Sequence, residues 1–86
     1  MVYKLIPLDY TDIIKALSKI GYVNDHQHGS HIVLYLADKN KYSFSFGERK
    51  PVIRLVVPAH KPLEKGMVRT IIRELDLSVE EFFGLL

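Results

Sequence analysis

The stretch Gly29–Leu36 (GSHIVLYL) decides how this chain folds. From His31 onward its side chains alternate with a period of two, which is typical of a β-strand with one buried face. One face carries Ile32, Leu34 and Leu36, and the other carries His31, Val33 and Tyr35. The aliphatic face predicts packing against a core, so His31 is expected on the more accessible face. The Gly-Ser pair before this strand predicts a tight turn, with Tyr22–His28 as the preceding strand.

Helices are predicted on both sides of this hairpin. Residues Asp9–Ile20 repeat apolar side chains at helical spacing and are followed by Gly21, a common helix stop. A second helix is predicted after a loop over Pro58–Gly66, and its apolar face consists of Met67, Val68, Ile71, Ile72 and Leu75. Ser78 is suited to cap a final short helix over Val79–Leu85.

Two further strands are predicted between the hairpin and the second helix. The turn residues Ala37–Asn40 precede Tyr42–Phe46, in which aromatic residues alternate with serine. The last predicted strand is Val52–Val57, with Arg54 on its outer side and a core side formed by Ile53, Leu55 and Val57. This order predicts an α+β two-layer sandwich, in which helices cover one face of a three- or four-stranded antiparallel sheet. The other face of the sheet is left open to a partner.

Length and composition limit the range of functions. With 86 residues the chain is expected to form a single domain over residues 1–86. Its 48% hydrophobic and 26% charged residues are ordinary for a globular protein. The absence of cysteine excludes disulfides and thiolate metal sites and favours the cytoplasm. The apolar part of Met1–Pro7 is too short for a signal peptide, and no run approaches the roughly 18 apolar residues of a membrane span.

Basic residues gather in one region of a chain whose net charge is only +2. Lys65, Arg69 and Arg73 recur at helical spacing and form a stripe away from the apolar face of the second helix. At the start of this helix, Gly66 would let a phosphate approach the backbone closely. The loop just before the helix adds two further candidates, His60 and Lys61. The stripe is interpreted either as a phosphate-binding surface or as an ordinary solvated helix face.

The histidines indicate proton-transfer chemistry more strongly than metal binding. His26, His28 and His31 are close in sequence, but no H-E-x-x-H pattern surrounds them and no carboxylate is conspicuously paired with them. We therefore expect no metal site. A histidine held beside a tight turn can act as a general acid or base, because the pKa of an unperturbed imidazole is about 6.5. His31 is the strongest candidate for that role.

Several short motifs occur in an order that resembles a known family. They are Gly21-Tyr22-Val23, Gly29-Ser30-His31, Val57-Pro58-Ala59-His60-Lys61, and Lys65-Gly66 leading a helix that contains Arg69. From Asp9 to Leu77 the chain resembles the HicA toxins, which are mRNA interferases of bacterial and archaeal toxin–antitoxin pairs. The resemblance implies a fold similar to the double-stranded-RNA-binding domain, with helices on one face of a three-stranded antiparallel sheet. This agrees with the layer order predicted from periodicity.

The resemblance also implies an activity and a partner. A member of this family is a metal-independent endoribonuclease without a cofactor, and the histidine of its Gly-Ser-His element, His31 here, is essential. Proton transfer by His31 would then cleave mRNA at a phosphodiester bond. The expected RNA and phosphate contacts are Gly29, Ser30, His60, Lys61, Lys65, Gly66 and Arg69. A HicB-type antitoxin is expected to cover the site.

The segment Ala37–Pro51 is long compared with the brief hairpin of the family. We interpret it as an extended, partly detached hairpin, whose Tyr42, Phe44 and Phe46 form an apolar ridge for the antitoxin or for a second copy of this chain. Two other functions stay open. One is a non-catalytic RNA-binding module that recognises A-form RNA by its shape. The other is a protein-interaction domain that uses the open sheet and the aromatic hairpin.

Overall fold

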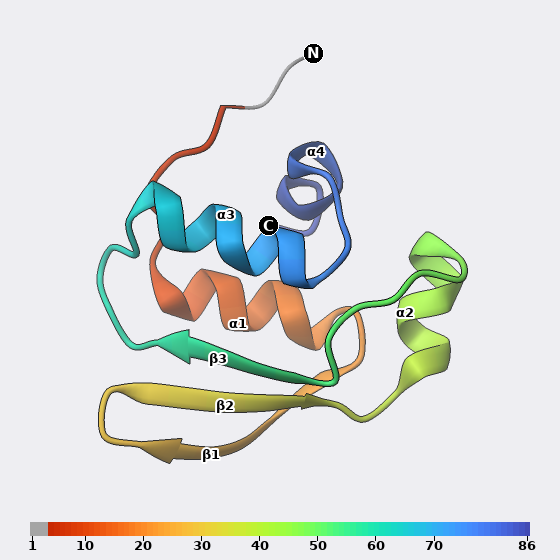
Figure 1. Cartoon of the computed structure of the whole chain (residues 1–86), viewed down its shortest axis with the longest axis horizontal. Coiled ribbons are helices and arrows are strands. Elements are labelled where there is room, and N and C mark those ends of the chain that lie inside the picture. Colours follow the sequence, from red (N-terminus) through yellow and green to blue (C-terminus); the bar gives the residue numbers. More distant parts are fainter. Residues whose placement is uncertain (1–3) are drawn as a thin grey trace.

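The computed structural model describes residues 4–86, so residues 1–3 of the predicted domain lie outside the described residues. Along these residues the elements follow in the order α1 (Tyr10–Ser18), β1 (Tyr22–His28), β2 (His31–Leu36), α2 (Lys39–Phe46), β3 (Arg54–Pro58), α3 (Lys65–Glu74) and α4 (Val79–Phe83) (Figure 1). None of the described helices is long and apolar enough to cross a membrane.

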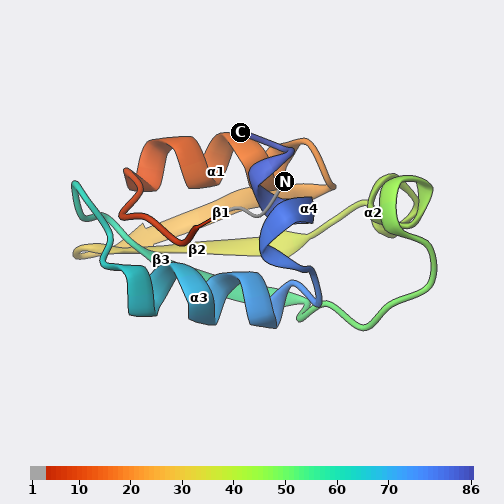
Figure 2. The ribbon, with the colours of Figure 1, turned by 90° about the horizontal axis from the view of Figure 1, so that it is seen from above.

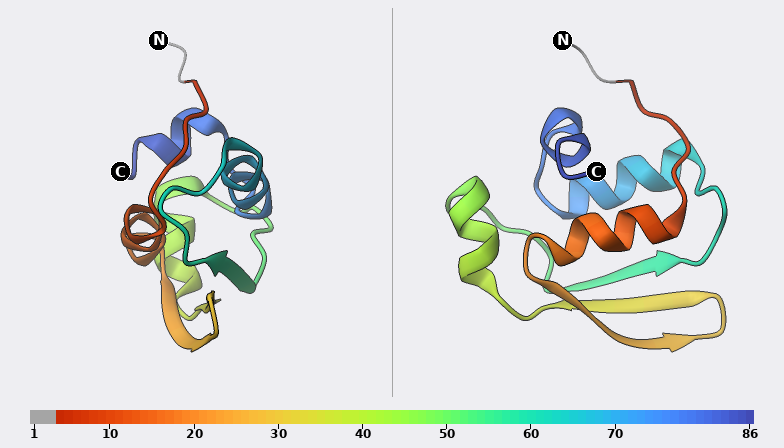
Figure 3. Two further views of the ribbon diagram at one scale, coloured as in Figure 1. Left: turned by 90° about the vertical axis from the view of Figure 1, so that its left-hand side faces the viewer. Right: turned by 180° about the vertical axis from the view of Figure 1, so that it is seen from behind.

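The three strands form one antiparallel sheet in the order β1-β2-β3. Helices α1 and α3 run alongside each other over this sheet, and α4 crosses near their C-terminal ends (Figure 2). Figure 3 shows α2 standing apart from the other helices, at one end of the sheet. The core between the two layers includes Ile13, Leu17, Ile32, Leu34, Leu55, Val57, Val68 and Ile71. The predicted α+β class, with an antiparallel sheet packed against helices, is confirmed, whereas the likeness to the double-stranded-RNA-binding domain stays a prediction.

Gly21 ends the first helix and fixes the start of the hairpin. Its φ of +100° lies in the region that favours glycine, and a Cβ atom there would lie 2.2 Å from the carbonyl oxygen of Asp38. Its own carbonyl accepts hydrogen bonds from the backbone N–H groups of Ala37 (3.0 Å) and Asp38 (3.1 Å). These contacts hold the residue before β1 against the residues after β2, and they fix the direction in which the hairpin leaves α1.

The segment predicted as an additional strand is the helix α2. Asp38 caps it by accepting a hydrogen bond from the backbone N–H of Lys41 (3.1 Å). In a helix, Tyr42 and Phe46 share one face, and their rings lie 5.4 Å apart. Phe44 points the other way and is 94% exposed.

Burial of Tyr42 explains why this segment is helical and attached to the domain. Its side chain is buried in the main core, and its hydroxyl donates a hydrogen bond to the carbonyl of Leu75 (2.6 Å). The strand predicted over Tyr42–Phe46, the partly detached hairpin and the aromatic ridge are therefore wrong. The turn predicted over Ala37–Asn40 is shorter than expected, because α2 already begins at Lys39.

The segment after α2 is anchored to the C-terminal part of the chain. The Arg49 guanidinium donates two hydrogen bonds to the Glu81 carboxylate, at 2.7 and 2.8 Å, and one to the carbonyl of Asp76 (3.1 Å). The hydrogen bond from Arg49 is the main reason why the pKa of Glu81 is lowered to about 2. Ser78 and Glu81 also form a capping box at the start of α4, which confirms the predicted cap.

Three predicted side-chain positions need correction. Strand β3 begins only at Arg54, so Ile53 lies before it and is 47% exposed rather than facing the core. Met67 is 38% exposed and lies off the apolar face of α3. Val33 belongs to the outer face of the sheet, as predicted, yet it is buried, and it lies opposite His26 and Val56.

Candidate active site at the turn between β1 and β2

The turn that precedes His31 is a tight two-residue connection. Gly29 has a φ of +60° and Ser30 lies outside the positive-φ region, which is the pattern of a type II′ hairpin turn. The carbonyl of Gly29 accepts a hydrogen bond from the Gln27 side chain (3.0 Å). The carbonyl of Ser30 accepts one from the backbone N–H of Ala59 (2.6 Å), which ties the turn to the end of β3. Both turn residues are exposed.

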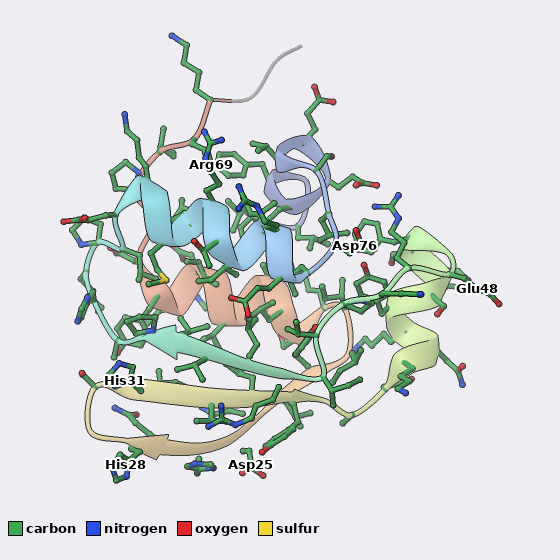
Figure 4. All side chains as sticks on the ribbon, in the orientation of Figure 1. Asp25, His28, His31, Glu48, Arg69 and Asp76 are labelled. Carbon is green, nitrogen blue, oxygen red and sulfur yellow. The ribbon has the colours of Figure 1, made fainter. Side chains whose placement is uncertain are left out.

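His31 is held by its backbone on both sides while its ring is free. Its Cα pairs with that of His28 in β1 and with that of Pro58 in β3. Its side chain is exposed on the outer face of the sheet, beside the turn (Figure 4). Within the described part of the chain, the imidazole has no hydrogen-bond partner. An imidazole held in this way can accept or donate a proton at a bound molecule without first breaking an internal contact.

The outer face around His31 combines imidazoles with aliphatic, aromatic and basic side chains. The strand register places His26 and His28 of β1 on this face, together with Val33 and Tyr35 of β2 and Val56 and Arg54 of β3. Nδ1 of His26 donates a hydrogen bond to the Asp25 carboxylate (2.6 Å). Among the described residues, no group of three or more histidine, cysteine, aspartate or glutamate side chains is arranged to hold a metal ion.

An open hollow of about 640 Å³ lies next to this turn, along the loop between β3 and α3. Its lining residues run from Pro58 to Glu64 and include Met67. Two predicted contact residues, His60 and Lys61, belong to this loop and are exposed. The Lys61 ammonium group lies 5.8 Å from the centre of the Tyr10 ring, so a cation–π contact positions it. The hydrogen bond between Ala59 and the turn brings this loop close to the Gly-Ser-His element.

The basic stripe on α3 is exposed, and its Arg69 is separate from His31. Among the described residues, neither Lys65 nor Arg69 forms an ion pair with a carboxylate. Gly66 is equally open, because a Cβ atom there would meet no heavy atom within 4 Å. Figure 4 shows Arg69 projecting from the side of α3 away from the sheet, whereas His31 lies at the sheet. The structure therefore brings the turn and the His60–Lys61 loop together and leaves Arg69 on another side of the molecule.

A family model matches most of the chain. The model described as "HicA toxin of bacterial toxin-antitoxin" matches residues 10–77. The chain belongs to the HicA toxin family. Searches of curated proteins and of solved structures returned no significant match. The matched range contains the whole hairpin, the loop after β3 and the basic stripe of this HicA toxin.

Membership of the family makes the chain a toxin of a toxin–antitoxin system. At the level of the family it also supports nuclease activity and pairing with a HicB antitoxin.

The structure adds one residue to the surroundings of His31. His28 was considered only as a metal ligand, but the register places it directly opposite His31. In a two-residue hairpin turn, the residues on either side of the turn are cross-strand partners. The sequence His-Gly-Ser-His therefore predicts that His28 pairs with His31.

Proposed function

We propose that this HicA toxin is a metal-independent endoribonuclease that cleaves mRNA, with His31 as a general acid–base residue. The observation that carries the proposal is the way in which His31 is held in the sheet. Its backbone is paired on both sides, and its exposed ring has no partner in the described chain. A side chain that stabilised the fold would instead be packed or hydrogen-bonded. Metal independence is what the resemblance to the HicA toxins implies, and the EDTA experiment below tests it.

The proposed reaction is a transesterification within the RNA. The 2′-oxygen of one nucleotide loses its proton to a base and attacks the adjacent phosphorus. The bond from phosphorus to the 5′-oxygen of the next nucleotide breaks, and that oxygen receives a proton. The products are a 2′,3′-cyclic phosphate and a 5′-hydroxyl end. His31 supplies one of these two proton transfers, each of which typically accelerates a reaction by about 10²–10⁴-fold.

Groups near the turn are suited to hold the phosphate during this reaction. The exposed backbone of Gly29 and Ser30 lies beside His31, and Lys61 supplies a positive charge from the neighbouring loop. His60 lines the same hollow. Lys65, Gly66 and Arg69 would contact the RNA backbone further along the strand.

We further propose that the antitoxin is of the HicB type and inhibits the toxin by covering His31. The aromatic ridge that we expected as its anchor does not exist, because Tyr42 is buried and Phe46 packs against it. The same correction removes the ridge as a reason for a homodimer. The outer face of the sheet, which carries His31, is the surface that an inhibitor has to reach.

The test compares His31→Ala with His26→Ala as a matched control. Both histidines are exposed and lie on the outer face of the sheet, but His26 is hydrogen-bonded to Asp25. With purified proteins and a defined RNA, His31→Ala should lose cleavage and His26→Ala should keep it. Excess EDTA should leave wild-type cleavage unchanged. Full cleavage by His31→Ala would refute the role of this residue, and loss of wild-type cleavage in EDTA would refute the metal-free reaction.

The same proteins separate this function from its strongest alternative. A non-catalytic RNA-binding module of the same fold would bind RNA in a filter-binding or fluorescence assay and leave it intact. A wild-type protein that binds RNA without producing 2′,3′-cyclic phosphate ends would support the binding module and contradict our proposal.

A further inference from the structure

We propose that His28 is the second acid–base group of the reaction and acts together with His31 across the turn. The inference rests on the proposed ribonuclease function. Cleavage of RNA requires one group to accept the 2′-hydroxyl proton and another to protonate the 5′-oxygen. The resemblance that pointed to His31 supplies only one of these groups.

The register of the hairpin places the two histidines directly opposite each other on neighbouring strands. His28 and His31 are Cα partners at the closed end of the β1–β2 ladder, on either side of Gly29 and Ser30. Side chains of directly opposed residues project from the same face of a sheet, with Cβ atoms about 4.5–5.5 Å apart. Both imidazoles are exposed, and neither has a hydrogen-bond partner in the described part of the chain. Figure 4 shows them flanking the same end of the sheet.

No other cross-strand neighbour of His31 can take this role. On its second side His31 pairs with Pro58, which has no titratable group. His26 lies two residue pairs further along β1, and its Nδ1 is engaged by Asp25. The remaining titratable or charged side chains that the register places on this face are Tyr35 and Arg54, at the far end of β2 and β3.

His60 is less suited than His28, although it is the other histidine of the region. Strand β3 ends at Pro58, and the backbone N–H of His60 donates a hydrogen bond to the Pro58 carbonyl (2.9 Å). The chain therefore turns away from the sheet before it reaches His60. Its side chain lines the hollow in the loop and is not part of the paired outer face.

Two neighbouring imidazoles can hold both protonation states that the reaction requires. Near neutral pH an imidazole can be neutral or protonated, so one ring can act as the base while the other acts as the acid. A phosphate bound over the turn would have one ring on the side of its 2′-oxygen and one on the side of its 5′-oxygen. After cleavage, the base carries the proton of the 2′-hydroxyl, and the acid has given its proton to the new 5′-hydroxyl.

The experiment uses the full-length toxin and two versions of one short RNA that contains a mapped cleavage site. In the second version sulfur replaces the 5′-oxygen at that site, because a thiolate leaves without being protonated. The proteins are the wild type, His28→Ala, His31→Ala and the control His26→Ala. Circular dichroism checks that each variant is folded, which is expected because both side chains are exposed and neither forms a hydrogen bond or ion pair in the described part of the chain.

We expect His28→Ala to lower kcat/KM on the ordinary RNA by about 10²-fold or more. The bell-shaped dependence of kcat/KM on pH should lose one of its two limbs in this variant. On the sulfur-containing RNA, the variant that lacks the acid should regain most of its activity, and the variant that lacks the base should not. Recovery of one of the two variants, and not of the other, supports the pair and identifies the acid.

Two results would overturn the inference without touching the proposed function. One is a His28→Ala toxin that keeps the wild-type rate and both limbs of the pH profile, while His31→Ala is inactive. The other is a failure of the sulfur substitution to restore either variant. In contrast, an active His31→Ala toxin would contradict the proposed function itself.

Discussion

Removal of one hydroxyl group should reveal whether α2 is part of the core. In the structure Tyr42 is 2% exposed, and its hydroxyl donates a hydrogen bond to the Leu75 carbonyl at 2.6 Å. Tyr42→Phe keeps the ring and leaves that carbonyl without its partner, which costs about 1–3 kcal/mol for a buried group. For a chain of this size, each kcal/mol lowers the melting temperature by about 4–8 °C. We therefore expect a drop of at least about 4 °C.

The matched control is Phe44→Ala, two residues away. Phe44 is 94% exposed, so its truncation should change the free energy of unfolding by no more than about 0.5 kcal/mol. Urea unfolding followed by circular dichroism gives both values, and an unchanged m-value shows that the unfolded states are comparable. If Tyr42→Phe proves neutral while Phe44→Ala destabilises the protein, α2 does not pack as described.

Three further predictions test other parts of the molecule. Replacing Lys65 and Arg69 together by Ala should weaken RNA binding. The slope of log K against log salt concentration, measured by titration at several salt concentrations, should fall by about 0.7 for each lost phosphate contact. The free energy of unfolding of the wild type should fall as the pH drops from about 4.5 to about 2, because the pKa of Glu81 is lower in the folded state than in the unfolded chain. Arg49→Gln should make this acid-dependent loss smaller in urea titrations. Gly21→Ala should destabilise the fold by more than about 1 kcal/mol in the same assay, because its Cβ atom would lie 2.2 Å from a backbone carbonyl oxygen and its φ is +100°.

The sequence was sufficient to predict the elements that carry one clear periodicity. Alternation over His31–Leu36 and helical spacing in the segments that became α1 and α3 identified the two layers. Each pattern arises because one face of the strand or helix is buried. Burial of that face also stabilises the element, so the pattern predicts the structure correctly. The exposed position of His31 followed from the same argument.

The error at α2 has a physical cause. Over only five residues, aromatic side chains at every second position fit a strand, but the outer two also lie four residues apart and fit one face of a helix. What decides between them is the cap at Asp38 and the hydrogen bond from Tyr42 to Leu75, which is 33 residues away. A contact so distant in sequence leaves no local signal. The pairing of His28 with His31 was more accessible, because it requires only the register of a two-residue turn.

The separation between His31 and the basic stripe suggests how binding and chemistry are divided. Arg69 projects away from the sheet that carries His31, so one phosphate cannot contact both side chains in the arrangement of Figure 4. A lost contact at Arg69 removes binding that the substrate and the transition state share, and such a loss raises KM while kcat stays nearly constant. Loss of a proton transfer at His31 should instead lower kcat. The Pro58–Glu64 loop joins β3 to α3 and holds Lys61 near the Tyr10 ring, so we expect an RNA that reaches both places to follow this loop. A flexible single strand can follow that path more easily than a stiff duplex, so we expect unpaired RNA to be cleaved faster than the same sequence in a hairpin stem. Equal cleavage rates for the two would show that the stripe and the turn do not contact the same strand.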